Sequence, residues 1–359
     1  MKLSLPSIGS KSMVGLDIGS SSVKAVELVS KGKDKEFELT NLGVAPLPNE
    51  AIVQGAFLNS SAIVEAIREA IEKGKIRSKH VAAAVSGHSV IVKKVSLPSM
   101  SRDELEEQIR WEAEQYIPFD VNEVNLDFQI LDPDGSDGQM DVLLVAAKKD
   151  LIDDYVQVIT EAGLTPATID VAAFAVENAF EANYDVGSGD VVALVNIGAQ
   201  VVNINIVSGG APTFTRDITT AGNQYTEEIQ KALSVSFDEA ERIKLGGQRK
   251  EDNQEVVPQE VEHAMQSVTE TVIGEISRSL DFYAATTADS RIERVFLAGG
   301  TAKVSNFRAA FAERTGHTVE ILNPLARMMP TTKFDPDYLD EVAPTLGVGV
   351  GLALRRVEI

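Results

Sequence analysis

The sequence predicts an α/β protein made of two related halves. Three observations support this fold class. Short apolar strand patterns alternate with amphipathic helix patterns, a strand–turn–strand segment at residues 14–28 recurs at residues 195–207, and glycine-rich turns follow several strands. With 359 residues, the chain is long enough for about two domains of ordinary size.

The net charge excludes several classes of partner. The chain carries 33 basic and 54 acidic side chains and a formal net charge of −21. Such a surface repels phosphate backbones and anionic lipids, so we expect no binding to nucleic acid and no direct insertion into a membrane. A polyanionic ligand would have to be held by local donors or by a cation.

The chain has no cysteine, which excludes disulfides and fits a reducing cytoplasm. Its four histidines are scattered and never at metal-ligand spacing. No apolar run approaches the roughly 20 residues that span a bilayer, and residues 1–13 read as a flexible segment without a signal-peptide pattern. A partner would therefore have to bring this protein to a membrane.

The first half predicts a sheet interrupted by an inserted unit. Strands are expected at residues 14–28, with a turn inside, and at 37–46 and 80–87, with a helix at 61–74. From residue 90 the pattern becomes strand, helix, strand, strand, helix, at residues 90–98, 102–117, 124–131, 140–149 and 150–163. In its first helix, Ser101 is the expected N-cap and Glu104 occupies the capping-box position.

The second half begins after a boundary at residues 185–190. A helix rich in small residues is predicted at 168–180, before the boundary, and the opening strand–turn–strand pattern returns after it. The segment "RVFLA" predicts a strand that ends at Gly299 and Gly300 and is followed by a helix. Residues 248–259 read as a surface loop.

The two strand–turn–strand segments align position by position. Asp17 lies over Asn196 and Gly19 over Gly198, with the strand pattern kept on both sides. Either turn alone reads as well as an ordinary hairpin. Two such turns, placed symmetrically in two halves, can hold one polyanion between them.

The residue types in the first turn suit a phosphate. Glycine allows close backbone approach and a positive φ, so that successive N–H groups point at the anion. Serine hydroxyls add donors, and Lys24 adds a positive charge. An acidic residue at the start of such a turn, here Asp17, typically holds Mg²⁺ through water.

Three further segments fit a nucleotide held between the halves. The backbone at Gly299 and Gly300 offers a flat surface for an adenine, although a plain strand-to-helix turn remains an alternative. Glu241 and Lys244 lie one helical turn apart and could reach a ribose and base, or form a solvated ion pair. The C-terminal small-residue segment "TLGVGVGLAL" suits a close crossing with the helix at 168–180, which would form a hinge.

Taken in order, the motifs "DIGSSSVK", "IDVAAFAVENAF", "NIGAQVVNI", "FLAGG" and "TLGVGVGLAL" resemble those of the actin-like ATPase superfamily, which includes actin, sugar kinases, MreB and FtsA. More narrowly, "IRWEAEQYIPFDVNEVNLDFQIL" resembles the type IV pilus assembly protein PilM family, as do the opening "DIGSSSVKAVEL" and the closing "GLALRR". The resemblance covers nearly the whole chain from residue 14.

This resemblance implies an actin-like ATPase fold, with two ribonuclease-H-like lobes and an inserted subdomain IC of the FtsA type. The expected segments are a flexible N-terminus at 1–13, subdomain IA at 14–91 and 166–186, subdomain IC at 92–165, subdomain IIA at 187–225 and 275–359, and subdomain IIB at 226–274.

The resemblance also implies a site for ATP and Mg²⁺ between the lobes. Residues expected to bind the nucleotide are Gly19, Ser20, Ser21, Ser22, Lys24, Gly198, Ala199, Gly222, Glu241, Lys244, Gly299 and Gly300. Asp17 and Asn196 would lie near the metal, through water, and Asp170 stands where active relatives place a water-orienting residue.

One departure concerns Asn196, because the second phosphate turn of the superfamily usually begins with aspartate. Losing that carboxylate weakens the hold on Mg²⁺ and on attacking water. Whether the protein is an enzyme therefore stays open, and slow or negligible ATP hydrolysis is expected.

As a function, the resemblance implies a cytoplasmic ATP-binding scaffold of the type IV pilus inner-membrane complex, peripheral on that membrane. Its expected partners are the N-terminal cytoplasmic peptide of PilN, in a groove between subdomains IA and IC, and other inner-membrane components, with self-association also expected. An FtsA-like filament protein and a small-molecule kinase are the alternatives. The helix at 102–117 is the surface to test, although its Trp111 more simply fills the core of the inserted unit.

Overall fold

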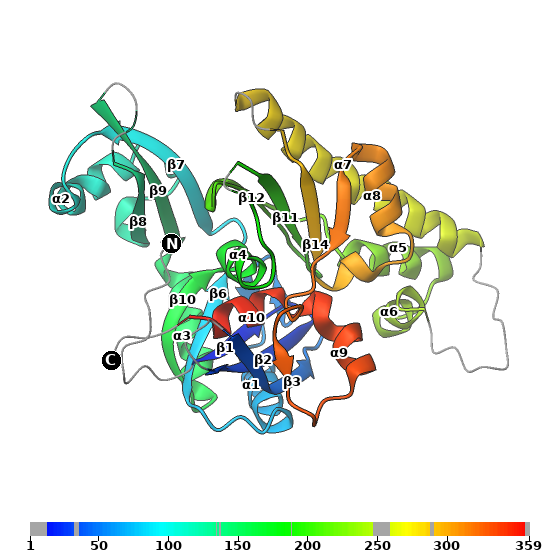
Figure 1. Ribbon diagram of the computed structural model, residues 1–359. Helices are drawn as coiled ribbons and strands as arrows, with labels where there is room; N and C mark the ends of the chain where they lie inside the picture. The colour runs from blue at the N-terminus through cyan, green and yellow to red at the C-terminus, as the bar shows by residue number, and fades with distance from the viewer. Residues whose placement is uncertain are drawn as a thin grey trace.

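The computed structural model describes residues 13–31, 36–133, 135, 138–187, 189–246, 259–287 and 291–355 (Figure 1). The N-terminal segment at 1–12 and nearly all of the predicted loop at 248–259 lie outside the described residues. Two large sheets form the centres of two lobes, and a smaller sheet forms a separate unit.

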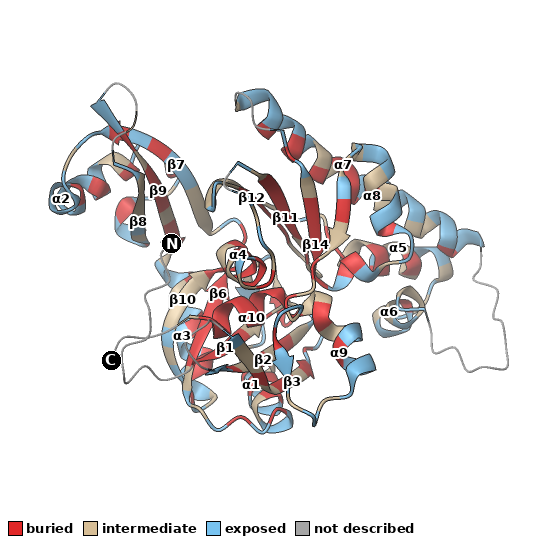
Figure 2. Cartoon of the chain, viewed as in Figure 1, coloured by how far each residue is buried: buried red, intermediate tan, exposed pale blue. Residues whose placement is uncertain are grey.

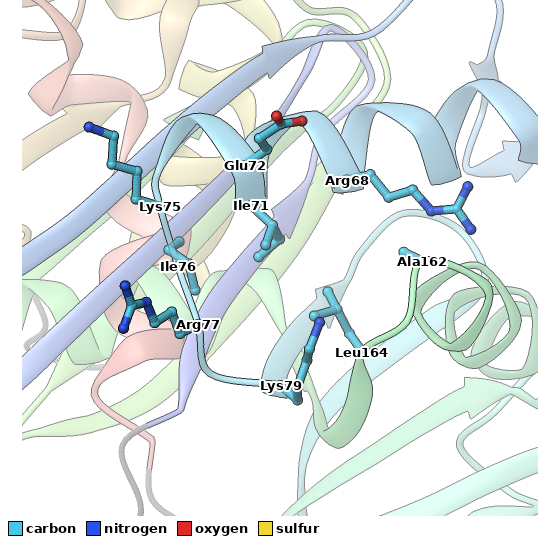
Figure 3. Close-up of a pocket in the computed structure, with 9 residues that line it drawn as sticks. All are labelled: Arg68, Ile71, Glu72, Lys75, Ile76, Arg77, Lys79, Ala162 and Leu164. Atoms are coloured by element: carbon cyan, nitrogen blue, oxygen red, sulfur yellow. The ribbon is translucent and has the colours of Figure 1, made fainter.

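The first lobe is built on a six-stranded sheet in the order β10-β6-β1-β2-β3-β16. Helices α1 (Ser60–Lys73) and α3 (Lys149–Glu161) pack on one face of it. The strands are β1 (Val14–Ile18), β2 (Ser22–Lys31), β3 (Glu36–Pro46), β6 (His80–Val85), β10 (Thr165–Val171) and β16 (Met329–Pro330), and a small hairpin joins β4 (Ile52–Val53) to β5 (Ala56–Phe57). A pocket opens between the C-terminal end of α1 and the segment that follows α3 (Figure 3).

The second lobe is built on a five-stranded sheet in the order β13-β12-β11-β14-β15. Helices α7 and α8 cover the outer face of this sheet. The strands are β11 (Val191–Ile197), β12 (Val202–Ser208), β13 (Ala211–Ile218), β14 (Arg294–Ala298) and β15 (Thr318–Ile321), and the helices are α5 (Asn223–Leu233), α6 (Phe237–Lys244), α7 (Gln259–Thr286), η3 (Gly300–Lys303) and α8 (Phe307–Thr315).

The two sheets share one topology. In the first, β1 pairs antiparallel with β2 and parallel with β6, and β2 pairs antiparallel with β3. In the second, β11 pairs antiparallel with β12 and parallel with β14, and β12 pairs antiparallel with β13. The repeat predicted from the sequence is therefore confirmed at the level of whole sheets.

Two helices made of small residues lie between the sheets. Helix α4 (Ala172–Asn183) and helix α10 (Gly347–Ala353) share a core with strands of both lobes, and every residue of α10 is buried (Figure 2). A Cβ atom added at Gly351 would lie 1.6 Å from the carbonyl oxygen of Ala175, so only glycine permits this crossing. The predicted close crossing is confirmed.

The chain returns to the first lobe near its C-terminus. Strand β16 pairs with β3, and α10 packs on β1, where a Cβ atom added at Gly15 would lie 1.9 Å from the carbonyl oxygen of Gly349. Helix α9 (Pro336–Val342) and the short helix η4 (Ala343–Thr345) lie between these elements. The predicted boundaries assign this segment to subdomain IIA, whereas its sheet contacts are with the first lobe.

The inserted unit has a sheet and core of its own. Its strands have the order β7-β9-β8, with β7 (Val90–Pro98), β8 (Val124–Asp132) and β9 (Gln139–Lys148), and helix α2 (Arg102–Ala113) and η1 (Val121–Glu123) complete it. The predicted capping box is present: Glu104 N donates to Ser101 Oγ at 3.3 Å, and Ser101 N donates to Glu104 Oε2 at 2.8 Å.

Three local predictions were wrong. The segment at 168–171 ends strand β10 instead of beginning a helix, because it pairs with β6. Helix α2 ends at Ala113, five residues before the proline expected to stop it. The Trp111 side chain is 79% exposed and does not fill the core of the inserted unit.

Candidate functional site

The first hairpin turn, between β1 and β2, combines free backbone donors with an ion pair. Gly19 N donates to the carbonyl of Ser22 at 3.1 Å and closes the turn. Within the described residues, the N–H groups of Ser20 and Ser21 donate to no protein acceptor. Asp17 and Lys24 face each other across the strands, with 3.1 Å between Oδ2 and Nζ.

The second hairpin turn, between β11 and β12, repeats this geometry with different side chains. Gly198 N donates to the carbonyl of Val201 at 2.9 Å, and in the described part of the chain the N–H groups of Ala199 and Gln200 have no protein acceptor. Asn196 and Asn203 face each other at the positions of Asp17 and Lys24, and Asn196 Nδ2 donates to Asn203 Oδ1 at 3.0 Å.

Glycine is required in both turns for space. A Cβ atom would lie 3.1 Å from the Ser22 carbonyl oxygen at Gly19 and 2.9 Å from the Val201 carbonyl oxygen at Gly198. Neither glycine has a positive φ, so the expected left-handed conformation is wrong for these turns. Gly299 does adopt it, with a φ of 88°, and a Cβ there would lie 2.3 Å from the carbonyl oxygen of Ile197.

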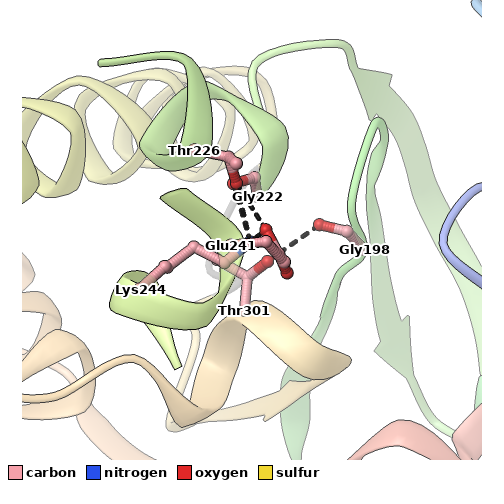
Figure 4. A network of polar contacts seen from close by, with 6 residues as sticks. All are labelled: Gly198, Gly222, Thr226, Glu241, Lys244 and Thr301. Carbon is pink, nitrogen blue, oxygen red and sulfur yellow. Dashed lines mark hydrogen bonds and ion pairs between the residues drawn. The ribbon is translucent and has the colours of Figure 1, made fainter. Parts of the chain in front are cut away.

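A polar network beside the second turn gathers several predicted residues (Figure 4). Both Gly222 N and Thr301 Oγ1 donate to the Gly198 carbonyl, at 3.1 and 2.9 Å. Lys244 Nζ lies 3.4 Å from the Gly222 carbonyl oxygen and 2.6 Å from Glu241 Oε2. The structure thus places four predicted residues and Thr301 in one cluster at the start of α5.

Glu241 and Lys244 are held in the second lobe by hydrogen bonds to Thr226 as well as by their own ion pair. The Lys244 side chain is only 8% exposed and also donates to Thr226 Oγ1 at 3.1 Å, while Thr226 donates to Glu241 Oε2 at 2.5 Å. A buried, hydrogen-bonded ammonium is a fixed positive charge near the backbone of Gly222. The pair is therefore neither fully solvated nor isolated from the second turn.

The two lobes contact each other through the second turn. Gln200 Nε2 donates to the Ile52 carbonyl, and Gln54 N donates to Gln200 Oε1 at 3.0 Å. One side chain of the turn thereby binds the β4–β5 hairpin of the first lobe by both of its polar atoms.

A buried carboxylate makes a second contact between the lobes. Asn203 Nδ2 donates to Asp217 Oδ1 at 2.8 Å, and Gly87 N, from the first lobe, donates to Asp217 Oδ2 at 2.5 Å. Burial raises the pKa of Asp217, and these two hydrogen bonds oppose that shift. Asn196, Asn203 and Asp217 therefore form a continuous line of hydrogen bonds across strands β11, β12 and β13, and this line ends at the Asp217 carboxylate.

Asp170, the predicted water-orienting residue, is engaged in an ion pair. Arg355 Nε and Nη2 lie 2.6 and 2.5 Å from Asp170 Oδ2, and Val171 N donates to Asp170 Oδ1 at 2.8 Å. Both side chains are largely buried, at 8% and 17% exposed. Asp170 connects the end of β10 to the end of α10.

The side chains of this site suit a metal ion that is bound mainly by the phosphates of a ligand, and they do not suit a metal ion bound by protein groups alone. No group of three or more histidine, aspartate or glutamate side chains able to hold a metal ion occurs among the described residues. Mg²⁺ commonly keeps several waters and binds through one or two carboxylates plus substrate phosphates. Asp17 could supply one such carboxylate, although Lys24 now pairs with it.

Four polar side chains in or beside the site were not predicted: Gln200, Asp217, Thr226 and Thr301. Two of them had a signal in the sequence: Gln200 lies inside a turn already recognised as a repeat, and Thr301 directly follows Gly299 and Gly300. The neighbours of Asp217 and Thr226 carry no distinctive pattern. In the part of the chain that the structure describes, no helix has the length and apolar character needed to cross a membrane.

The paired sheets and paired turns define the actin-like ATPase fold. In comparisons with solved structures, a complex described as the PilM-PilN type IV pilus biogenesis complex matches with a TM-score of 0.85 and 29% identity, over 96% of this chain and 98% of that one. MreB5 of Spiroplasma citri bound to AMPPNP matches with a TM-score of 0.50 and 12% identity, over 90% and 95% of the two chains, and shows the fold alone.

The sequence profile of the family described as type IV pilus assembly protein PilM matches residues 15–357, and the chain belongs to this family. Among curated relatives, the cell division protein FtsA of Bacillus subtilis (strain 168) is 24% identical over 255 residues, which is 64% of this chain. The chain spans 57% of the length of that relative. The resemblance predicted from the sequence is confirmed for both family and fold.

Proposed function

We propose that this protein is a nucleotide-binding scaffold of a type IV pilus assembly complex at the bacterial inner membrane. The observation that carries the proposal is the match, over 96% of the chain, to a structure described as the PilM-PilN type IV pilus biogenesis complex. The short N-terminal cytoplasmic peptide of a PilN protein is the proposed partner, and it would hold this protein at the membrane surface. Other inner-membrane components and further copies of this chain are proposed as additional partners.

The proposed nucleotide is ATP with Mg²⁺, bound between the lobes so that both hairpin turns would contact its phosphates. Among the residues that the structure describes, the N–H groups of Ser20, Ser21, Ala199 and Gln200 have no protein acceptor, and this supports the proposal because such donors bind phosphate oxygens. Lys24 supplies the charge: a Cβ at Gly19 would lie 3.5 Å from its Nζ, so the ammonium lies beside the first turn. The relative bound to AMPPNP has the same fold.

On the nucleoside side, the cluster around Gly222 would face the ribose, and Gly299 and Gly300 the adenine. A Cβ atom added at Gly300 meets nothing closer than Thr345 Cγ2 at 4.0 Å, so the backbone there offers an open surface. Mg²⁺, when bound, supplies charge neutralisation of the phosphates. Asp17 and Asn196 would orient its water ligands.

Hydrolysis is proposed to be slow. Asn196 donates its amide to Asn203 and has no carboxylate to offer, and Asp170 is held by Arg355. We expect purified protein to bind ATP and turn it over far more slowly than about 1 per second, which is the low end of ordinary enzymes. A turnover of several per second that is abolished in Lys24→Ala would contradict the scaffold role, and stimulation by sugars would favour a kinase.

The partner is tested with a synthetic peptide. A peptide with the N-terminal cytoplasmic sequence of a PilN protein is titrated into this protein, with a scrambled peptide as control, and binding is followed by calorimetry. Trp111 is the only tryptophan of the chain, so its fluorescence reports on the α2 surface alone. We expect heat with the native peptide only. The absence of heat would contradict the proposed partner, and long ATP-dependent polymers formed without peptide would favour an FtsA-like protein.

A further inference from the structure

The inserted unit is joined to the lobes by a narrow connection (Figure 1). The chain enters the unit through residues 86–89, between β6 and β7, and leaves it at Lys148, where β9 ends and α3 begins. These two crossings lie side by side, because Lys148 N donates to the Ser89 carbonyl at 3.0 Å. In the part of the chain that the structure describes, the core of the unit consists of residues between positions 91 and 146, and none of them belongs to the core of either lobe. A body joined in this way can change its orientation unless a further contact holds it.

One such contact comes from the second lobe. Gly87 N, in the segment that enters the unit, donates to Asp217 Oδ2 at 2.5 Å, and the strand of Asp217, β13, is the edge strand of its sheet and lies beside β7. Gly87 has a φ of 90°, and a Cβ atom added there would meet nothing within 4 Å. Glycine is therefore needed here for its backbone conformation, in which its N–H reaches Asp217, and not for space.

From Asp217, hydrogen bonds lead back to the second hairpin turn. Asp217 is the register partner of Asn203, and Asn203 is the register partner of Asn196, so the three side chains are neighbours across β13, β12 and β11. Asn203 Nδ2 donates to Asp217 Oδ1 at 2.8 Å, and Asn196 Nδ2 donates to Asn203 Oδ1 at 3.0 Å. These three side chains and Gly87 N are named the polar line. It runs from the second hairpin turn to the base of the inserted unit.

The order of donors and acceptors in the polar line is fixed. An ionised carboxylate only accepts hydrogen bonds, so Asn203 must direct Nδ2 towards Asp217, and its Oδ1 is then left for Asn196. Asn196 Nδ2 carries a second hydrogen, and within the residues that the structure describes no acceptor binds it. Since each amide depends on the orientation of the next, a change at one end alters the bonds at the other.

We propose that the polar line holds the inserted unit in place and transmits to it the state of the second hairpin turn. When Gly87 N is bonded to Asp217, the unit is fixed against the second lobe. When this bond is broken, the unit turns on its narrow connection.

A ligand at the second hairpin turn would favour the fixed state. A phosphate oxygen that accepts the second hydrogen of Asn196 Nδ2 would hold this amide in the orientation that the polar line requires. ATP would thereby set the orientation of the inserted unit, and with it the surface that the unit offers to a partner. The identity of this ligand rests on the proposed function, whereas the link between the turn and the unit does not.

The test measures the position of the inserted unit directly. Because the chain has no cysteine, two introduced cysteines carry the only spin labels. Glu107→Cys is an exposed position of α2 in the inserted unit, and Ala284→Cys is an exposed position of α7 in the second lobe. Double electron–electron resonance gives the distribution of distances between the two labels, and circular dichroism verifies that each variant folds.

Without ligand, Asp217→Ala should broaden the distribution most, because Gly87 N then loses its acceptor. Asn196→Ala, at the far end of the polar line, should broaden it less, and adding Asn196→Ala to Asp217→Ala should broaden it no further. Glu320→Ala removes the same charge from β15, the opposite edge strand, and should leave the distribution unchanged. If Asp217→Ala does not fold, Asp217→Asn replaces it, since an amide keeps the shape but offers a single acceptor oxygen.

Two results of this comparison would overturn the proposal. If removal of the Asp217 carboxylate leaves the distribution unchanged, the polar line does not hold the inserted unit. If Asn196→Ala has no effect, or broadens the distribution equally with and without the carboxylate, nothing is transmitted through the polar line.

ATP with Mg²⁺ is then added, and its binding to the same labelled proteins is measured by calorimetry. We expect ATP to narrow the distribution when Asp217 is present and to leave it unchanged in Asp217→Ala. Bound ATP that narrows both equally, or neither, would overturn the proposal. The absence of ATP binding would contradict the proposed function alone, because the ligand-free comparison tests the link without a nucleotide.

Discussion

The two hairpin turns share one pattern of backbone hydrogen bonds and differ in the charge of their facing side chains. Each turn is closed by one hydrogen bond from a glycine N–H to a carbonyl three residues later, and each leaves two N–H groups free within the described residues. The facing pair, however, is Asp17 with Lys24 in the first turn and Asn196 with Asn203 in the second. A duplicated backbone therefore need not carry duplicated chemistry.

The difference assigns distinct tasks to the two lobes. The first turn carries ionised groups that suit the proposed phosphates and metal. The second turn carries neutral amides, and its polar groups form contacts between the lobes. Gln200 donates to the Ile52 carbonyl in the β4–β5 hairpin, and Asn203 donates to the Asp217 carboxylate, which also accepts from Gly87 N. The second turn and its strands therefore link the two lobes directly.

The largest expected effect is a difference in ATP affinity between a variant of the charged pair and a variant of the amide pair. Lys24→Ala removes a cation from the first turn, and we expect ATP affinity to fall about a hundredfold, which corresponds to about 3 kcal/mol. Asn203→Ala removes the hydrogen bonds to Asn196 and to the Asp217 carboxylate but no charge from the turn, and we expect a loss of about tenfold. Calorimetry with ATP and Mg²⁺ measures both, and Lys231→Ala, on an exposed face of α5, is the control. Equal losses would show that the turns do not differ in function.

A second prediction concerns the carboxylate that joins α4 to the second sheet. Glu177 accepts a hydrogen bond from Asn205 Nδ2 at 2.7 Å, and burial raises the pKa of Glu177 to about 7. The folded protein therefore holds this proton in a pH range where the unfolded chain has released it. Stability from this group is complete below about pH 4.5 and is lost as the pH rises towards 7 and above.

Glu177→Gln should remove this dependence, since glutamine can still accept from Asn205 and does not ionise. Between pH 5 and pH 8 we expect the unmodified protein to lose about 2 kcal/mol more stability than the variant does. Urea unfolding at both pH values measures the difference. Parallel pH profiles for the two proteins would show that the buried carboxylate does not titrate in this range.

The smallest expected effect compares the two glycines. A Cβ at Gly198 would meet the Val201 carbonyl oxygen at 2.9 Å, whereas one at Gly19 would meet the Ser22 carbonyl oxygen at 3.1 Å. We expect Gly198→Ala to cost about 2 kcal/mol and Gly19→Ala about 1 kcal/mol, because the tighter contact forces a backbone shift. Urea unfolding without nucleotide measures both. A larger cost at Gly19 would mean that the first turn is the more rigid of the two.

The sequence alone determined the parts of this protein that depend on local patterns. The α/β class, the duplicated strand–turn–strand, the capping box at Ser101 and the small residues of α4 and α10 all follow from residues close together in the chain. Their physical basis is local, since strand alternation, helix periodicity and the space around a glycine depend on neighbouring residues. Family membership followed from the same motifs.

Only the tertiary structure decided which side chains meet. Asp170 and Arg355 are 185 positions apart, Gln200 and Ile52 are 148 apart, and neither pair is marked by any spacing in the sequence. Trp111 was misplaced for a different reason: it lies two positions after Ile109 on α2, so it points away from the buried face formed by Leu105, Ile109 and Ala113, as helix periodicity alone indicates. Residues 168–171 became a strand because β6 was available to pair with them. Contacts between distant segments depend on how the lobes pack, and that packing has no signature in a local pattern.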